Sequence, residues 1–135
     1  MKKLIAAIVA AYVILMGTNY LIHSIILMPD YDAIPLSHRD NAGIMHRMWE
    51  MAIGQFLLAV VFAYIYRRGV ERKSWAMQGI RYGILMTFLI VIPNSLSEYM
   101  VYLIPHILAI KWMILGGIQM ILMGLAVAAI CKEPA

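Results

Sequence analysis

Four long apolar runs, separated by short polar segments, dominate the hydrophobic pattern of the chain. The runs cover residues 4–28, 42–66, 75–93 and 107–131. As an α-helix, the first run would rise about 37 Å at about 1.5 Å per residue, enough to cross a hydrocarbon core of about 30 Å with some tilt. The pattern therefore predicts an all-α integral membrane protein. Residues 1–135 are expected to form a single domain with four transmembrane helices.

The segments between the runs are short and contain residues that end helices. Residues 29–41 carry two prolines and are predicted to form a loop, and residues 67–74 form a short basic turn. Pro93 is predicted to end or kink the third span, because proline lacks a backbone N–H and clashes with the preceding turn. Residues 94–106 are mixed in character and are expected to form a helical extension at the membrane interface. Connections this short favour an antiparallel up-down-up-down bundle.

Small residues occur in the last two runs at positions where they would let helix backbones approach closely. We expect them to form packing contacts within the bundle rather than a dimer interface. The residues concerned are Gly79, Gly83, Gly116, Gly117 and Gly124.

Composition agrees with lipid as the main solvent of this chain. Hydrophobic residues make up 64% and charged residues 13%, whereas a soluble domain is about half apolar and about a quarter charged. Cys131 is the single cysteine of the chain, so a disulfide within one chain is excluded. Enzymes that make or break disulfides need two thiols in one chain, so this chemistry is not expected. The net charge of +4 comes largely from one short loop. It therefore indicates the orientation of the spans rather than binding to nucleic acid.

The charged residues are distributed unevenly between the two sides of the predicted bundle. Five cations and one acid lie in residues 67–81, whereas two cations and four acids lie in residues 29–50. The positive-inside rule then places residues 67–81 and both chain termini in the cytoplasm. We expect a multi-pass protein of the inner (cytoplasmic) membrane, with its histidines on the outer half or outside it.

The histidines are the candidate functional residues. His23 is the deepest in the predicted membrane, and His46 and Glu50 share one face of the second helix because they are four residues apart. Imidazoles from two helices, supported by a carboxylate, are typical ligands of haem b or a transition metal. His23, His46 and His106 are therefore candidate cofactor ligands, and His46 with Glu50 is a candidate metal pair. The alternative is that these groups lie at headgroup depth and are hydrated, as we expect for His38 on its polar loop.

Other polar residues suggest little chemistry. Lys111 lies one turn into the last helix and is predicted to extend to the membrane surface or to pair with Glu98. No serine stands in a nucleophile-elbow motif and no phosphate-binding glycine loop is present, so no catalytic residue is predicted and an enzyme is not expected. Proton-coupled carriers need an acid near the middle of the membrane, whereas Glu50 and Glu98 lie near its outer boundary.

Three segments of the chain resemble a family of small bacterial inner-membrane proteins with four spans and no established activity. They are "NYLIHSIILMPDY", "RRGVERKSWAMQGIRYGILM" and "LAIKWMILGGIQMILMGLAVAAI", and the resemblance covers nearly the whole chain. It rests on His23 late in the first span, a glycine-bearing turn before "GIRYG", and Lys111–Trp112 opening the last helix. The resemblance implies a four-span architecture in a bacterial inner membrane. His46 and His106 stand where the family pattern does not require histidine.

These observations favour a non-catalytic accessory or assembly subunit that packs against a larger, bioenergetic membrane complex. Its expected partners are the lipid bilayer and either other membrane-protein subunits or further copies of this chain, without nucleic acid. The second hypothesis is a haem- or metal-binding redox protein that uses His23 with His46 or His106. The third is an oligomeric carrier of a small solute.

Overall fold

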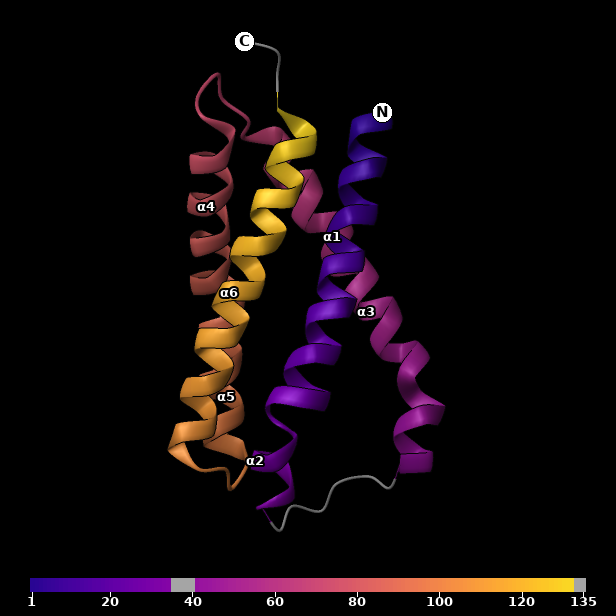
Figure 1. The fold of residues 1–135 in the computed structure, drawn as a ribbon, viewed down its shortest axis with the longest axis vertical. Coiled ribbons are helices and arrows are strands. Elements are labelled where there is room, and N and C mark those ends of the chain that lie inside the picture. The colour runs from indigo at the N-terminus through magenta and orange to yellow at the C-terminus, as the bar shows by residue number, and fades with distance from the viewer. Residues whose placement is uncertain (35–40, 133–135) are drawn as a thin grey trace.

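The computed structural model describes residues 1–34 and 41–132, and this part of the chain is helical without any β-strand (Figure 1). It contains four helices long and apolar enough to cross a membrane, at Lys2–Ile26, Ala42–Arg68, Trp75–Val101 and His106–Cys131. The predicted all-α class with four membrane-spanning helices is therefore confirmed. The elements in chain order are α1 (Lys2–Leu21), η1 (Ile22–Ile26), α2 (Met28–Asp32), α3 (Asn41–Arg68), α4 (Trp75–Met86), η2 (Thr87–Val91), α5 (Ile92–Val101) and α6 (His106–Cys131).

The helices form an antiparallel up-down-up-down bundle, as predicted. Helix α6 packs against α4 and α1, and α1 packs against α3. Both chain termini and the connection between α3 and α4 lie at one end, which we call the basic end, while α2 lies at the opposite end, the α2 end (Figure 1). Helix α3 diverges from α1 towards the α2 end. At the α2 end, α3 therefore lies apart from α1.

The helix of the third span continues beyond Pro93 to Val101, so of the two outcomes predicted for Pro93, an end or a kink, the end does not occur. Residues Thr87–Val91 form a π-helical turn, in which the N–H of Ile92 donates to the carbonyl of Thr87, five residues back. Pro93 then lies in the first turn of α5, where its missing N–H is tolerated. A π turn widens the backbone just before the proline ring would clash with it, and this lets the helix continue to Val101. Residues 94–101 of the predicted helical extension are therefore helical, and their position at the membrane interface stays a prediction.

A second difference lies in the segment predicted as a loop between the first two spans. Within it, residues Met28–Asp32 form the short helix α2, with Pro29 in its first turn. Before α2, η1 is a second π-helical turn, and the N–H of Leu27 donates to the carbonyl of Ile22 over 2.8 Å. The chain thus turns back over the bundle directly after the first span.

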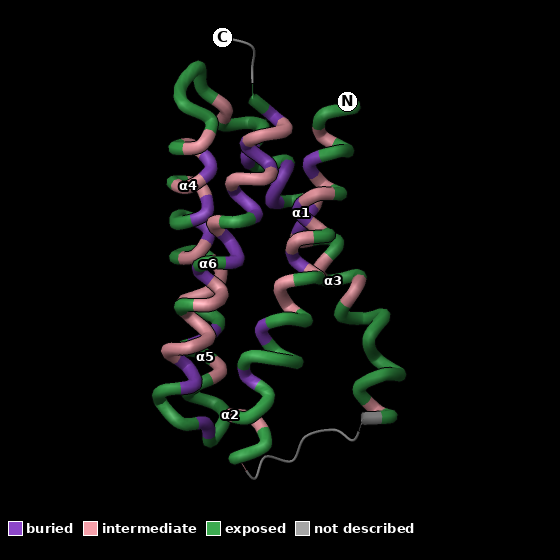
Figure 2. Tube along the Cα trace, viewed as in Figure 1, coloured by how far each residue is buried: buried purple, intermediate pink, exposed green. Residues whose placement is uncertain are grey.

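The core lies mainly in the half of the bundle near the basic end. There, small and medium side chains of α1, α3 and α6 are buried against one another, including Ala7, Ala11, Leu15, Ala59, Phe62, Ala63, Met123 and Val127. A smaller cluster at the α2 end joins the end of the first span to the start of α6, through Ile22, Leu27, Ile104, Leu108 and Ala109. Figure 2 shows the buried positions along α1, α4 and α6, and the exposed beginning of α3.

The glycines of α4 and α6 allow these two helices to touch through their backbones. A Cβ atom added to Gly79 would lie 2.8 Å from the carbonyl oxygen of Gly124, and one added to Gly83 would lie 2.5 Å from the Cα of Ile121. Neither contact leaves room for a side chain. The predicted role of these glycines as packing contacts within the bundle is confirmed.

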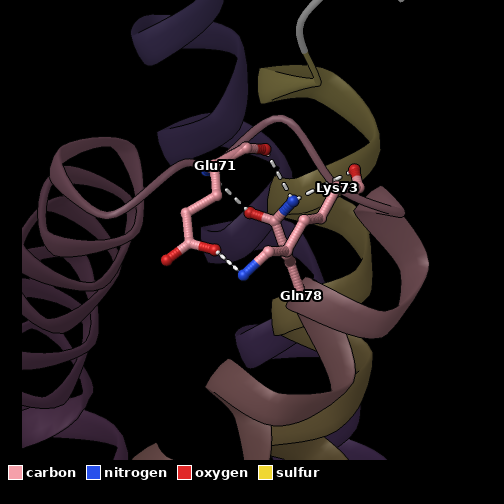
Figure 3. Close-up of polar contacts among 3 residues, drawn as sticks. All are labelled: Glu71, Lys73 and Gln78. Carbon is pink, nitrogen blue, oxygen red and sulfur yellow. Dashed lines mark hydrogen bonds and ion pairs between the residues drawn. The ribbon is translucent and has the colours of Figure 1, made fainter.

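The connection between α3 and α4 is held by Gln78, one turn into α4 (Figure 3). Its Nε2 donates to the carbonyls of Glu71 (2.7 Å) and Lys73 (3.1 Å), and its Oε1 accepts from the N–H of Glu71 (3.0 Å). The Lys73 ammonium bonds the Glu71 carboxylate and lowers the pKa of that carboxyl. One side chain therefore satisfies three backbone groups that would otherwise depend on water.

Candidate functional site

A polar cavity of about 370 Å³ extends from the α2 end towards the middle of the bundle. It is lined by residues of all four spans and of α2. Both π-helical turns contribute to it, through Ile22 and His23 of η1 and Ile90 and Val91 of η2. Such turns often occur at functional sites. The polar and hydrogen-bonding side chains in its lining are Asn19, His23, Tyr31, Gln55, Asn94, Ser95, Glu98, Trp112 and Gln119.

The deep part of the cavity is formed by amides near the middle of the spans. Gln119 is only 6% exposed, and its Nε2 lies within hydrogen-bonding distance of Thr18 Oγ1 (2.6 Å) and Asn19 Oδ1 (2.9 Å). These bonds join α6 to α1 where the apolar core of the basic end stops. Buried amides in a membrane are satisfied by other helices when lipid surrounds them.

Gln55 is the exception among these amides. It lies near the middle of α3 and lines the cavity, and its Oε1 atom is buried without a hydrogen-bond partner in the described part of the chain. An unpaired buried acceptor costs about 1–3 kcal/mol. The side chain therefore offers an acceptor to any donor that enters the cavity.

Gln55→Leu should leave the free energy of unfolding unchanged or raise it by up to about 1 kcal/mol, because the substitution removes an unpaired acceptor. Thermal unfolding in a mild detergent, followed by circular dichroism, measures this effect. Gln119→Leu is the matched control, since it breaks the bonds to Thr18 and Asn19 and should lower stability by about 1–2 kcal/mol. Equal destabilisation by the two substitutions would mean that Gln55 has a structural role.

The part of the cavity nearest the α2 end carries a hydrogen-bonded aromatic group. Trp112 Nε1 donates to the hydroxyl of Tyr31 over 2.9 Å, and this hydroxyl lies 2.7 Å from His23 Nδ1. The His23 and Tyr31 rings are stacked, with centroids 6.1 Å apart. Burial raises the pKa of Tyr31, although the bond from Trp112 opposes the shift, so the phenol stays protonated at neutral pH. Helix α2 thereby fixes the orientation of the imidazole towards the cavity.

Glu98 supplies the charge of the cavity. Among the described residues in the lining it is the only acid, and none is Lys or Arg. Its Oε1 accepts a hydrogen bond of 3.0 Å from Asn94 Nδ2, one turn earlier on α5. The side chain is partly buried. The polar part of the lining therefore comprises one carboxyl group, one imidazole, one hydroxyl, four amides and two aromatic rings.

Lys111 does not pair with Glu98, contrary to one of the two arrangements expected from the sequence. Its Nζ lies 2.7 and 2.9 Å from the two carboxylate oxygens of Asp30. The reason is α2, which turns the chain back and brings Asp30 over the first turns of α6. Because Asp30 balances Lys111, the carboxylate of Glu98 is left to the cavity.

The sequence-predicted site residues are placed as follows. His23 lines the cavity, whereas His46, Glu50 and His106 are not among its lining residues. His46 is exposed on α3, Glu50 lies 3.4 Å from Arg47, and His106 contacts the edge of the Tyr99 ring at 5.3 Å between centroids. The prediction for His38 falls outside the described residues.

The metal and haem sites stay predictions. Within residues 1–34 and 41–132, no group of three or more His, Cys, Asp or Glu side chains is arranged to hold a metal ion. A site at His46 and Glu50, or one that uses His23 with His46 or His106, draws no support from this arrangement.

The prediction from the sequence missed the four amides of the polar lining. Its signal was available, because Asn19, Gln55, Asn94 and Gln119 interrupt otherwise apolar stretches of the four spans. Polar side chains within membrane spans are rare and face the interior of the bundle or a cavity. Attention to histidines and acids alone passed over them.

Comparison with known proteins adds no relative from which a function could be transferred. No family model matches the chain, and no curated protein and no solved structure matches it significantly. The site has to be interpreted from its own chemistry.

Proposed function

We propose that this multi-pass membrane protein binds a small, positively charged organic solute in the cavity at the α2 end. The observation that carries the proposal is Glu98, the one acid among the described lining residues, which include no Lys or Arg; the other polar groups there are amides, a hydroxyl, two aromatic rings and the His23 imidazole. A carboxylate in partly buried surroundings is stabilised by a cation that enters with it. The protein acts as a binding protein.

The remaining lining residues agree with a cation that has hydrogen-bond donors and an apolar part. Gln55 Oε1 is an unpaired acceptor, and Tyr31 and Trp112 provide aromatic surfaces of the kind that attract ammonium groups. The volume of about 370 Å³ lies at the small end of the range for ligand sites, which is about 300–1,000 Å³. A primary amine with one ring or a short alkyl chain fits these features.

The orientation is part of the proposal. The positive-inside rule places the basic end in the cytoplasm of a bacterium and the α2 end outside the inner membrane. The cavity then receives its solute from the outer side, and a carrier function would begin with this binding step. The accessory-subunit role predicted from the sequence stays a prediction, because none of the cavity contacts bears on it.

Three ring compounds of the same size test the proposal with the purified full chain in mild detergent. Benzylammonium carries a positive charge at pH 7, benzyl alcohol is neutral, and benzoate is negative. We expect benzylammonium to bind about tenfold more tightly than benzyl alcohol, a difference of about 1.4 kcal/mol, and benzoate not to bind. Quenching of tryptophan fluorescence reports the titration, with Trp112→Phe as the control for signal from Trp49 and Trp75.

Equal affinity for benzylammonium and benzyl alcohol would show that Glu98 does not contribute to binding. It would overturn the proposal that the ligand is a cation. Failure of all three compounds to bind or to raise the melting temperature would overturn the binding function itself.

A further inference from the structure

Arg67 is an exposed residue at the basic end, and no described residue bonds its guanidinium. It lies in the last turn of α3 and lines one cavity of about 320 Å³ together with Leu4, Tyr64 and Arg68. It also lines a cavity of about 160 Å³ with Lys3, Val70 and Cys131. Among the described residues no acid lines either cavity. One guanidinium is thus shared by two cationic cavities between the ends of α1, α3 and α6.

The neighbouring cations are held in place, whereas Arg67 is not. Arg68 Nη2 donates to the Tyr64 hydroxyl over 2.7 Å, and its guanidinium stacks over that ring at 5.1 Å. Lys3 Nζ donates to the carbonyl of Lys132 over 2.9 Å. Arg67 makes no hydrogen bond or ion pair within the described part of the chain. The nearby acid Glu71 is already bonded to Lys73.

The exposed guanidinium of Arg67 is therefore open to an anion, and its location indicates the source of that anion. Arg67 stands at the end of the span Ala42–Arg68, where a membrane helix meets the lipid headgroups. Leu4 and Val70 add apolar surface beside the cations. Cationic pockets between helices on the cytoplasmic side are suited to anionic lipid headgroups.

We propose that Arg67 binds the headgroup of an anionic phospholipid that carries two phosphates, one in each of the two cavities. Lys3 supports the phosphate in the smaller cavity, and Arg68 supports the one in the larger. Guanidinium is well suited to this role, because its planar donors can bond two phosphate groups on different edges. This site is separate from the solute cavity and stands whether or not that cavity binds a cation.

Native mass spectrometry of the delipidated full chain tests the proposal. Diphosphatidylglycerol, phosphatidylglycerol and phosphatidylcholine are added separately at equal concentration, and inorganic phosphate is added as a fourth arm. We expect an adduct with diphosphatidylglycerol that is about fivefold more abundant than that with phosphatidylglycerol, and none with phosphatidylcholine or inorganic phosphate. Arg67→Gln should reduce the first adduct about tenfold.

Arg81→Gln is the matched control, because Arg81 is exposed on α4 and lines neither cavity. Lys3→Gln tests the supporting role of Lys3 in the smaller cavity. This substitution of an exposed residue should reduce the adduct about threefold. If the Arg67 and Arg81 variants lost equal amounts of the adduct, the lipid would be held by nonspecific charge attraction. That result would overturn the site. Binding of inorganic phosphate alone, or equal binding of the two phosphatidylglycerol lipids, would overturn the two-phosphate lipid as its ligand.

Discussion

Glu98→Gln should weaken the binding of benzylammonium at least tenfold and change the affinity for benzyl alcohol less than about twofold. At an effective dielectric constant of about 20, two unit charges 4 Å apart attract each other by about 4 kcal/mol. Partial desolvation of the ammonium offsets much of this, and a net loss of about 1.4 kcal/mol corresponds to the tenfold change. Glutamine keeps the size of the side chain and can accept the bond from Asn94 that Glu98 now accepts. The substitution therefore removes charge with little change of shape.

Glu50→Gln is the matched control for this prediction. Glu50 is exposed on α3, lies 3.4 Å from Arg47 and is outside the cavity lining. Titration of both variants with the two compounds should show a loss of preference for the cation in the Glu98 variant only. A preference that survives Glu98→Gln would show that Glu98 does not select the ligand.

The extent of the spans could be predicted from the sequence because it depends on local properties. Run length and apolarity placed the second and fourth spans at residues 42–66 and 107–131, and the corresponding helices are Asn41–Arg68 and His106–Cys131. The third span was predicted to end or kink at Pro93, and its helix instead continues to Val101. The effect of Pro93 depends on the π turn that precedes it. The sequence of that turn is apolar and does not distinguish a π turn from an ordinary α-helix.

The partner of Lys111 depends on contacts between segments far apart in the chain. Asp30 reaches Lys111 only because α2 folds back, and the bond between Trp112 and Tyr31 holds α2 against α6. No periodicity in residues 29–41 indicates this turn. Glu98, which the sequence suggested as a partner, instead faces the cavity with Asn94.

Of the residues predicted as cofactor or metal ligands, His23 lines the cavity, and its role as a ligand stays a prediction. The other lining residues could not be predicted, because the rotation of each helix about its axis decides which side chains face the cavity. The apolar spans have too little pattern to reveal that rotation. Gln119 and Asn19 meet because α1 and α6 pack together, while His46 lies on the exposed start of α3, where this helix diverges from the bundle (Figures 1 and 2). A position in the outer half of a predicted span therefore does not show which polar side chains share a cavity.

Gly83→Ala should lower the stability of the bundle by about 1–3 kcal/mol, the usual effect of an extra carbon in a filled interior. The new Cβ would lie 2.5 Å from Ile121 Cα and 2.7 Å from the carbonyl oxygen of Met120. Both are backbone atoms that no rotamer change can move, so α4 and α6 have to separate. Thermal unfolding in mild detergent, followed by circular dichroism, measures the loss.

Gly54→Ala provides the control for this substitution, because a Cβ at Gly54 would meet nothing within 4 Å. The same change in the same kind of helix should be neutral or stabilise the protein by up to about 1 kcal/mol, since alanine is the better helix former. A difference between the two variants thus isolates the contact between α4 and α6 from helix propensity. Equal melting temperatures would contradict the backbone contact, and with it the close packing that holds η2 and α5 beside α6 to form one wall of the cavity.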